Sequence, residues 1–289
     1  IDHSSGEIST EEANILINEI KTHMNNEKFQ FYTGTSYRHL TIWNRGESLD
    51  LTPPHDILGK GIKDYLPTNP LLKEMMIKSY EILNNHPINL ERQKKGLNKA
   101  NSIWFWGLGT KPDLDLFEQK FSKKGAMISA VDLLKGIAVG AGMDVISVKG
   151  ANGSLNTNYE GKALAACKAL LEDGKDFAYI HIEAPDEMSH QGSINNKVKS
   201  IEFIDEKVVK LVLDQLSSSQ LPFKILIMPD HPTPLRYRTH TSDPVPYMIY
   251  DSRRQRNNPW TYNEKEAARS KNIINEGYTI MNKFLEKEN

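Results

Sequence analysis

The first part of the chain has apolar residues at helical spacing. Ser9 followed by Glu12 is a capping-box sequence, in which the two side chains bond backbone N–H groups where a helix begins. Apolar residues then recur every three or four positions: Ala13, Leu16, Ile17, Ile20 and Met24. This pattern predicts an amphipathic helix. Short strands are predicted at residues 29–31 and 40–43, and a second helix at 70–84.

Beyond residue 100, apolar runs alternate with amphipathic segments. The continuous apolar run 103–109, closed by glycines, is typical of a buried parallel strand. Further strands are predicted at 126–129, 144–148, 177–183 and 225–228, and helices at 131–141, 161–171 and 197–216. This alternation predicts an α/β fold with a mostly parallel sheet flanked by helices. We place a domain boundary after the polar segment 91–101, between a smaller α+β domain (1–100) and the α/β domain (101–289).

The charge balance narrows the classes of partner. The 36 basic and 37 acidic residues nearly cancel, and like charges form no block, so neither nucleic acid nor a membrane surface is an expected partner. No apolar stretch approaches the ~20 residues that span a bilayer, so we expect a soluble protein. The single cysteine, Cys167, lies in a small-residue helical run and is expected to pack as a small apolar side chain rather than to react. The absence of a disulfide framework fits a reducing cytoplasm.

Candidate chemistry lies where two predicted strands end. The strand at 177–183 leads into Asp186 and His190, and the strand at 225–228 leads into Asp230 and His231. Because the carboxyl ends of parallel strands meet at one edge of a sheet, we expect these side chains to lie close together. His240, shortly before the apolar segment 246–250, adds a third histidine. Carboxylate oxygen and imidazole nitrogen suit manganese or zinc better than an all-oxygen magnesium or calcium cage.

Structural explanations compete with the metal site. A lone histidine in a loop is more often a satisfied structural residue than a ligand, and an aspartate after a strand can simply cap the next helix. Two such pairs and a third histidine would each need a separate structural explanation. The combination therefore favours metal binding.

Three segments carry a family resemblance. Residues 184–192, 229–234 and 238–246 resemble, in order, the three metal motifs of the cofactor-independent phosphoglycerate mutases, and most closely the archaeal-type branch of that family within the alkaline phosphatase superfamily. Residues 31–39 and 124–142 also resemble the family. The resemblance implies that 101–289 is the C-terminal part of an alkaline-phosphatase-like, metal-binding domain. Residues 1–100 would be an inserted, transferase-like domain that binds the substrate.

The resemblance also implies ligand sets and a mechanism. Asp186, His190 and His240 would hold one divalent ion, and Asp230 with His231 would hold a second. Both ions are expected to be Mn²⁺, with Zn²⁺ or Mg²⁺ as alternatives. The family passes a phosphoryl group from 3-phosphoglycerate to a serine, reorients the glycerate and returns the group to the other hydroxyl. The metals neutralise charge on the phosphoryl group.

The family's nucleophile has no matching segment here. In the family, the second metal is also held by an aspartate near the N-terminus and by the nucleophilic serine. Ser189 lies between two ligands and Ser4 and Ser5 open the chain, but none follows a strand as the family's serine does. Because the sequence begins with isoleucine, we expect the natural start to lie upstream and this chain alone to be incomplete and inactive.

The expected substrate is a small phosphorylated hydroxy acid, whose phosphate and carboxylate need cationic side chains. Arginine is suited to both because it binds bidentately. Arg38 with His39 in a glycine-containing loop is the leading candidate, since it matches an arginine-bearing loop of the family. The other candidates for substrate binding are Asp2, His3, Arg92 and Lys135. For Arg38, Arg92 and Lys135, the alternative role is a solvated charge at the surface. His55 is a further candidate, for which the alternative is a purely structural role in a turn.

These observations lead to an enzyme that interconverts 3- and 2-phosphoglycerate in glycolysis and gluconeogenesis. The alternatives are a metal-dependent phosphatase, another phosphotransferase of the same superfamily, or a metal-binding fragment without activity. Fold analogy does not separate them. The Arg38 loop favours a mutase, because reorientation requires that the dephosphorylated acid stays bound.

Overall fold

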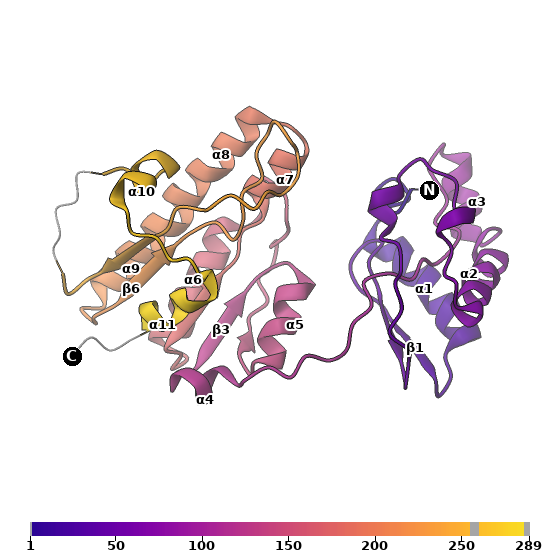
Figure 1. The fold of residues 1–289 in the computed structure, drawn as a ribbon, viewed down its shortest axis with the longest axis horizontal. Coiled ribbons are helices and arrows are strands. Elements are labelled where there is room, and N and C mark those ends of the chain that lie inside the picture. Colours follow the sequence, from indigo (N-terminus) through magenta and orange to yellow (C-terminus); the bar gives the residue numbers. More distant parts are fainter. Residues whose placement is uncertain (1, 255–259, 286–289) are drawn as a thin grey trace. The chain divides into compact units, whose positions relative to one another are not determined.

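A computed structural model describes residues 2–254 and 260–285 of the chain, which forms two compact units, Ile1–Lys111 and Pro112–Asn289 (Figure 1). Unit 1 contains three helices, a two-stranded sheet and two short 3₁₀ turns among its described residues. The elements are α1 (Thr10–Met24), β1 (Phe29–Tyr32), β2 (Leu40–Trp43), turns at Pro54–Ile57 and Lys63–Tyr65, α2 (Pro70–Leu83) and α3 (Pro87–Lys94).

The early elements of unit 1 follow the sequence pattern. The Ser9 side chain accepts the N–H of Glu12 at 3.2 Å and begins α1, as the capping box predicts. Strands β1 and β2 pair antiparallel, with Phe29 opposite Trp43, and the two rings stack with centroids 5.3 Å apart. The predicted apolar face of α1 is buried against β1 and α2. The predictions for α1, α2 and both strands are confirmed.

Helix α3 is an element that the apolar pattern did not predict. The His86 side chain caps its start by accepting the N–H of Ile88 at 3.2 Å, and Pro87 occupies its first turn. The two buried residues of α3 are polar, Asn89 and Arg92. Asn89 donates to the carbonyl of Leu83 at 2.8 Å. Because α3 packs through hydrogen bonds, its sequence has no apolar periodicity.

The strand predicted at 103–109 is wrong. These residues have neither strand nor helix geometry, and Ile103 and Phe105 pack against the core of unit 1. The Trp104 indole donates to the carbonyl of Thr52 at 2.9 Å. The run is apolar because it completes the core of unit 1 without pairing in a sheet. For the same reason unit 1 extends to Lys111, beyond residue 100.

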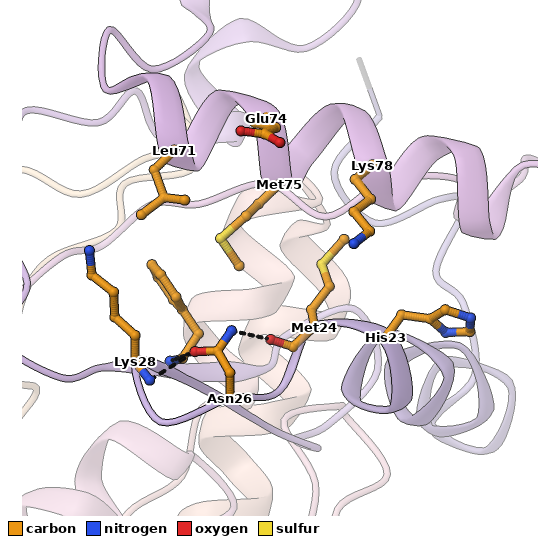
Figure 2. A pocket seen from close by; sticks show the side chains of 9 residues that line it. His23, Met24, Asn26, Lys28, Leu71, Glu74, Met75 and Lys78 are labelled. Atoms are coloured by element: carbon orange, nitrogen blue, oxygen red, sulfur yellow. Dashed lines mark hydrogen bonds between the residues drawn. The ribbon is translucent and has the colours of Figure 1, made fainter.

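An open pocket of about 330 Å³ lies between α1, β1 and α2 in unit 1. Figure 2 shows Leu71 and Met75 of α2 pointing toward the loop that carries Asn26 and Lys28. None of the site residues predicted from the sequence lines this pocket. It is therefore separate from the candidate site.

Unit 2 is built on short strands flanked by helices. Three parallel strands lie in the order β4-β3-β5, and β6 pairs antiparallel with β7. The strands are β3 (Gly125–Ile128), β4 (Asp144–Val145), β5 (Phe177–Ile180), β6 (Lys224–Ile227) and β7 (Met248–Asp251). The helices are α4 (Phe117–Phe121), α5 (Asp132–Gly140), α6 (Tyr159–Leu171), α7 (Ala184–His190), α8 (Ile194–Ile204), α9 (Lys210–Ser218), α10 (Glu264–Ser270) and α11 (Ile280–Leu285). The predicted α/β class with a smaller α+β domain is confirmed.

Strand β3 is buried along its whole length, and α6 packs with α9 and β5 in the core of unit 2. A π-helical segment, Asp205–Val209, joins α8 to α9, so the helix predicted at 197–216 is continuous (Figure 1). Cys167 is buried in this core, and burial raises the pKa of its thiol, in agreement with the predicted packing role. Within the described residues no helix has the length and apolar character needed to cross a membrane.

Candidate metal centre

Helix α7 presents two ligands on one face. Three residues separate the end of β5 from the start of this helix, which is formed by Ala184 and Pro185. Asp186 and His190 are four residues apart, so their side chains lie one above the other on the helix surface. The Nε2 atom of His190 lies 3.2 Å from Oδ2 of Asp186.

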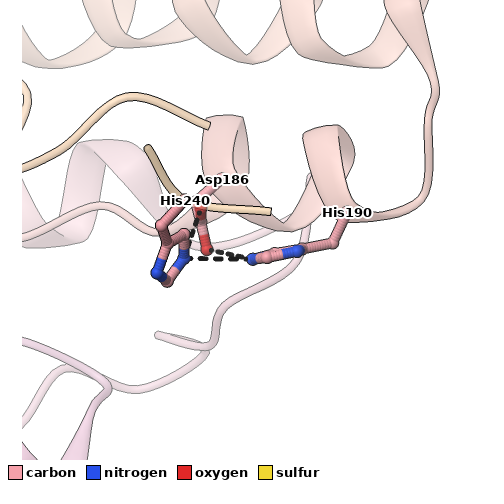
Figure 3. A group of neighbouring side chains, drawn as sticks. All are labelled: Asp186, His190 and His240. Atoms are coloured by element: carbon pink, nitrogen blue, oxygen red, sulfur yellow. Dashed lines mark hydrogen bonds and ion pairs between the residues drawn. The ribbon is translucent and has the colours of Figure 1, made fainter. Parts of the chain in front are cut away.

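His240 joins this pair from the segment between β6 and β7 (Figure 3). Its Nε2 atom lies 3.2 Å from Nε2 of His190 and 3.3 Å from Oδ1 of Asp186. One donor atom from each residue lies within 4.8 Å of the other two. Ligand atoms around a tetrahedral ion with bonds of about 2.1 Å are roughly 3.4 Å apart, so the observed spacing fits one divalent ion.

A backbone carbonyl sets the ring orientation of His190. The Nδ1 atom lies 2.9 Å from the carbonyl oxygen of Arg238, which can only accept, so Nδ1 carries the proton. The lone pair of a neutral ring is then on Nε2, which points at Asp186 and His240. Gly192 permits this arrangement: its φ is +70°, and a Cβ atom there would lie 2.5 Å from Nε of Arg238.

Thr233 connects the ligands, although the sequence analysis did not single it out. Its hydroxyl donates to Asp186 and lies 3.3 Å from Nδ1 of His231. Lys197 of α8 in turn donates to the carbonyl of Thr233 at 2.9 Å. Burial lowers the pKa of the Lys197 amine, while Asp186 and Glu264 act in the opposite direction. Thr233 lies inside the 229–234 motif, and this position is the feature of the sequence that could have identified it as part of the site.

Replacing Thr233 by valine removes the hydroxyl but keeps the shape of the side chain. We expect the affinity for Mn²⁺ to fall about tenfold, because partners that orient a metal ligand typically contribute 10–100-fold. Isothermal titration with Mn²⁺ measures the change. Thr241→Val is the matched control, since that hydroxyl, on the same segment, donates only to the exposed Asp243 at 2.7 Å. Equal affinities in the two variants would rule out the orienting role.

The second predicted pair lies next to the first. Asp230 and His231 follow β6, with Nε2 of His231 3.6 Å from Oδ2 of Asp230. The His231 and His240 rings have centroids 3.9 Å apart. Burial raises the pKa of Tyr179 on β5, and the Asp230 carboxylate raises it further, so Asp230 also lies near the end of β5. The structure thus brings Asp186, His190 and His240 together, and His231 lies beside His240 with Asp230 next to it in the chain.

Two of the three serines considered as nucleophiles, Ser189 and Ser4, have structural hydrogen-bond partners. Ser189 is fully buried in α7, and its hydroxyl donates to the carbonyl of Pro185 at 2.7 Å. In unit 1, the Ser4 hydroxyl donates to Asp2 at 3.1 Å. These hydrogen bonds agree with the expectation that neither is a nucleophile.

In unit 1, aromatic rings surround His3, whose Nδ1 atom is buried without a hydrogen-bond partner among the described residues. Its ring makes edge contacts with Tyr37 at 5.0 Å and His55 at 6.3 Å, and His55 contacts Trp106 at 5.3 Å. Tyr37 and Trp106 were not among the sequence candidates.

Asp2 is placed by hydrogen bonds. Burial raises its pKa, but hydrogen bonds from Asn98 and Ser4 outweigh burial and leave the pKa below its usual value. Asp2 is therefore held as a carboxylate near the start of unit 1.

Arg38 and His39 have different surroundings. The Arg38 guanidinium stacks on Tyr37 at 5.6 Å, which places it beside the His3 cluster. His39 accepts the N–H of Gly34 at 3.1 Å through Nδ1, and burial lowers its pKa. A neutral, backbone-bonded His39 shapes the Arg38 loop.

The other two cations have protein partners. Arg92 is 3% exposed, and its guanidinium donates to Glu12, to the carbonyl of Ser5 at 2.6 Å and to that of Asn98 at 2.8 Å. Lys135 lies on α5 of unit 2, with Nζ 3.2 Å from Asp132. The contacts of Arg92 join segments of unit 1 to one another. The Lys135 side chain remains partly exposed.

Comparison with known proteins defines the class. The family model of the metalloenzyme superfamily matches residues 13–287. A protein of Pyrococcus horikoshii has a similar structure, with a TM-score of 0.73 at 26% identity over 93% of this chain and 66% of its own. A cofactor-independent phosphoglycerate mutase of Thermoplasma acidophilum has a TM-score of 0.58 over 94% of this chain and 69% of its own, and at 21% identity it shows the fold alone.

Two sequence relatives narrow the class. A 2,3-bisphosphoglycerate-independent phosphoglycerate mutase of Methanosarcina barkeri is 50% identical over 86% of this chain and 63% of its own length. A probable enzyme of the same name from Geobacter sulfurreducens is 43% identical over 99% of this chain and 72% of its own length. The chain belongs to the metalloenzyme superfamily and, within it, to the 2,3-bisphosphoglycerate-independent phosphoglycerate mutases.

This membership confirms the family predicted from the three metal motifs. Together with the Asp186, His190 and His240 cluster, it indicates that the protein uses a divalent metal. The chain spans less than two thirds of the Methanosarcina barkeri relative.

Proposed function

We propose that this chain supplies the metal-binding and substrate-binding residues of a cytoplasmic mutase that interconverts 3-phosphoglycerate and 2-phosphoglycerate in glycolysis and gluconeogenesis. The observation that carries the proposal is the convergence of Asp186, His190 and His240, with donor atoms 3.2 to 3.3 Å apart, in a chain of this family. The proposed route passes through a phosphoserine. That serine is not assigned to a residue of this sequence.

In the proposed site, Asp186, His190 and His240 hold one ion, and Asp230 and His231 contribute to a second. The nitrogen and oxygen donors favour Mn²⁺, with Zn²⁺ and Mg²⁺ as the ions to compare. When bound, the ions would supply charge neutralisation to the phosphoryl group. Thr233 and the Arg238 carbonyl hold the ligands in orientation.

The residues proposed to bind substrate act through charge and hydrogen bonding. Arg38 offers a bidentate cation for a carboxylate or phosphate, and its stacking on Tyr37 limits its rotation. Asp2, kept ionised by its hydrogen bonds, can accept from a glycerate hydroxyl, and His3 lies close enough in sequence to assist. His39 keeps the Arg38 loop in shape. Lys135 is proposed as a phosphate contact.

The test is a coupled assay of the protein at its natural full length. Purified protein, stripped of metal and then given Mn²⁺, is expected to convert 3-phosphoglycerate to 2-phosphoglycerate without added 2,3-bisphosphoglycerate and to lose activity with a chelator. Free phosphate is measured in the same samples. Phosphate release without 2-phosphoglycerate would identify a phosphatase instead, and activity that persists in chelator would overturn the metal mechanism.

A further inference from the structure

Lys162, on α6, has no solvent-exposed surface although it carries an ammonium group. A buried charge costs free energy unless it is paired and hydrogen-bonded. The Nζ atom donates to the carbonyl of His181 at 3.0 Å. Burial lowers the pKa of Lys162, and the nearby Glu183 carboxylate opposes that shift. Both partners lie in the short connection between β5 and α7.

Glu183 is enclosed at the same point. It precedes α7 as the N-cap residue, but its side chain does not cap the helix. Its Oε1 atom is buried and has no hydrogen-bond partner within the described parts of the chain, and Nδ1 of His181 lies 3.6 Å away. The backbone of Gly153 covers the other oxygen, because a Cβ atom there would lie 2.6 Å from Oε2. The carboxylate is therefore largely enclosed, between His181 and Gly153.

This connection leads directly into the metal ligands. The carbonyl of Glu183 accepts the N–H of Asp186 at 2.9 Å and that of Glu187 at 3.1 Å, which are the first hydrogen bonds of α7. A shift of the connection would move Asp186 and, through the helix, His190. Metal affinity is sensitive to such shifts, because ligands must be held within about 0.5 Å of the productive geometry.

We propose that Lys162 and Glu183 are positioning residues, which lock the β5–α7 connection to α6 and so hold Asp186 and His190 in the geometry that binds a divalent metal. The inference rests on the metal site of the proposed function and goes beyond it by assigning a role to a buried lysine and a partly buried carboxylate outside the ligand motifs. It does not depend on the identity of the substrate.

The experiment is a titration of the metal-free, full-length protein with Mn²⁺. Lys162→Met keeps the length and apolar stem of the side chain and removes the charge. Mn²⁺ affinity is expected to fall by about 10- to 100-fold, the usual effect of losing a partner that orients metal ligands. Lys168→Met is the matched control, since Lys168 lies on the same helix, is exposed and pairs with Asp173.

Two further variants complete a double-mutant cycle: Glu183→Gln, and Lys162→Met combined with Glu183→Gln. Lys162→Met removes the hydrogen bond to the His181 carbonyl, and Glu183→Gln removes the carboxylate charge near Lys162. We therefore expect both changes to weaken Mn²⁺ binding, and the double variant to lose less than the two effects added. Thermal unfolding of the metal-free proteins is measured in parallel. A purely structural role would lower the melting temperature but leave the affinity of the folded protein unchanged.

The measured affinities distinguish a failure of the positioning role from a failure of the proposed metal site. If the parent protein binds Mn²⁺ and both Lys162→Met and Glu183→Gln bind it as tightly as Lys168→Met, the positioning role is overturned while the metal site stands. If the parent protein binds no Mn²⁺, the proposed metal site and the positioning role both fail. Should Lys162→Met not fold, Glu183→Gln, which preserves side-chain shape, decides the result alone.

Discussion

Replacing Asp186 by asparagine is expected to lower mutase activity at least about 10³-fold, because the change removes several kcal/mol of charge stabilisation from the metal. Asp186 lies beside both of the other candidate ligands. The Nε2 atom of His190 is 3.2 Å from its carboxylate, and the Nε2 atom of His240 is 3.3 Å away. Asparagine keeps the shape of the side chain and can still accept from Thr233. Loss of the negative charge is therefore the main effect.

Activity is measured with the coupled assay on full-length protein, and Mn²⁺ affinity by titration. Asp214→Asn is the matched control, since Asp214 is exposed on α9 and pairs with Lys210 at 3.0 Å. That control is expected to match the parent protein in both measurements. An Asp186→Asn protein with parental Mn²⁺ affinity would contradict the ligand assignment.

Replacing Arg92 by methionine is expected to destabilise unit 1 by about 3 kcal/mol, the lower end for breaking a buried ion pair. The change removes a guanidinium that donates to Glu12 and to the carbonyls of Ser5 and Asn98. Glu12 is partly exposed and can regain water, which keeps the effect at the lower end. The KM for 3-phosphoglycerate is expected to stay unchanged where the protein is folded.

Urea unfolding followed by tryptophan fluorescence measures this effect, since Trp43, Trp104 and Trp106 lie in unit 1 and only Trp260 lies in unit 2. Lys94→Met on the same helix is the control, because Lys94 is exposed and such changes stay within about 0.5 kcal/mol. If Arg92→Met unfolds like this control and instead raises the KM, Arg92 contacts substrate, which is one of the two roles that its sequence context allows.

Much of the candidate site could be predicted because its signals are local in sequence. Asp186 and His190 are four residues apart and follow a strand, and Asp230 and His231 follow another. The rule that parallel strands end at one edge of a sheet predicted that they would lie close together, although β5 and β6 belong to different sheets in the structure. Thr233, Lys162 and Lys197 were not predicted as part of the site, because a threonine and two lysines have no spacing that distinguishes them from surface residues.

Arg92 shows why the cations were harder to interpret. In sequence it stands in a charged run, which allows a surface charge and a substrate contact equally. Its main carboxylate partner, Glu12, is 80 residues away, so only folding shows that the pair is mostly buried. Helix α3 was not predicted because its buried residues are polar, so its sequence lacks the apolar periodicity of a packed helix.

The sequence by itself determined the first helix, the hairpin strands, the α/β alternation and the positions of the five candidate metal ligands, because capping, periodicity and motif order depend on neighbouring residues. Tertiary structure alone decided that residues 103–109 complete unit 1, that Thr233 joins Asp186 across 47 positions, and that Lys162 is buried with its amine bonded to the connection between β5 and α7. These features arise from burial and from contacts between distant segments, which the local pattern of apolar and polar residues does not encode.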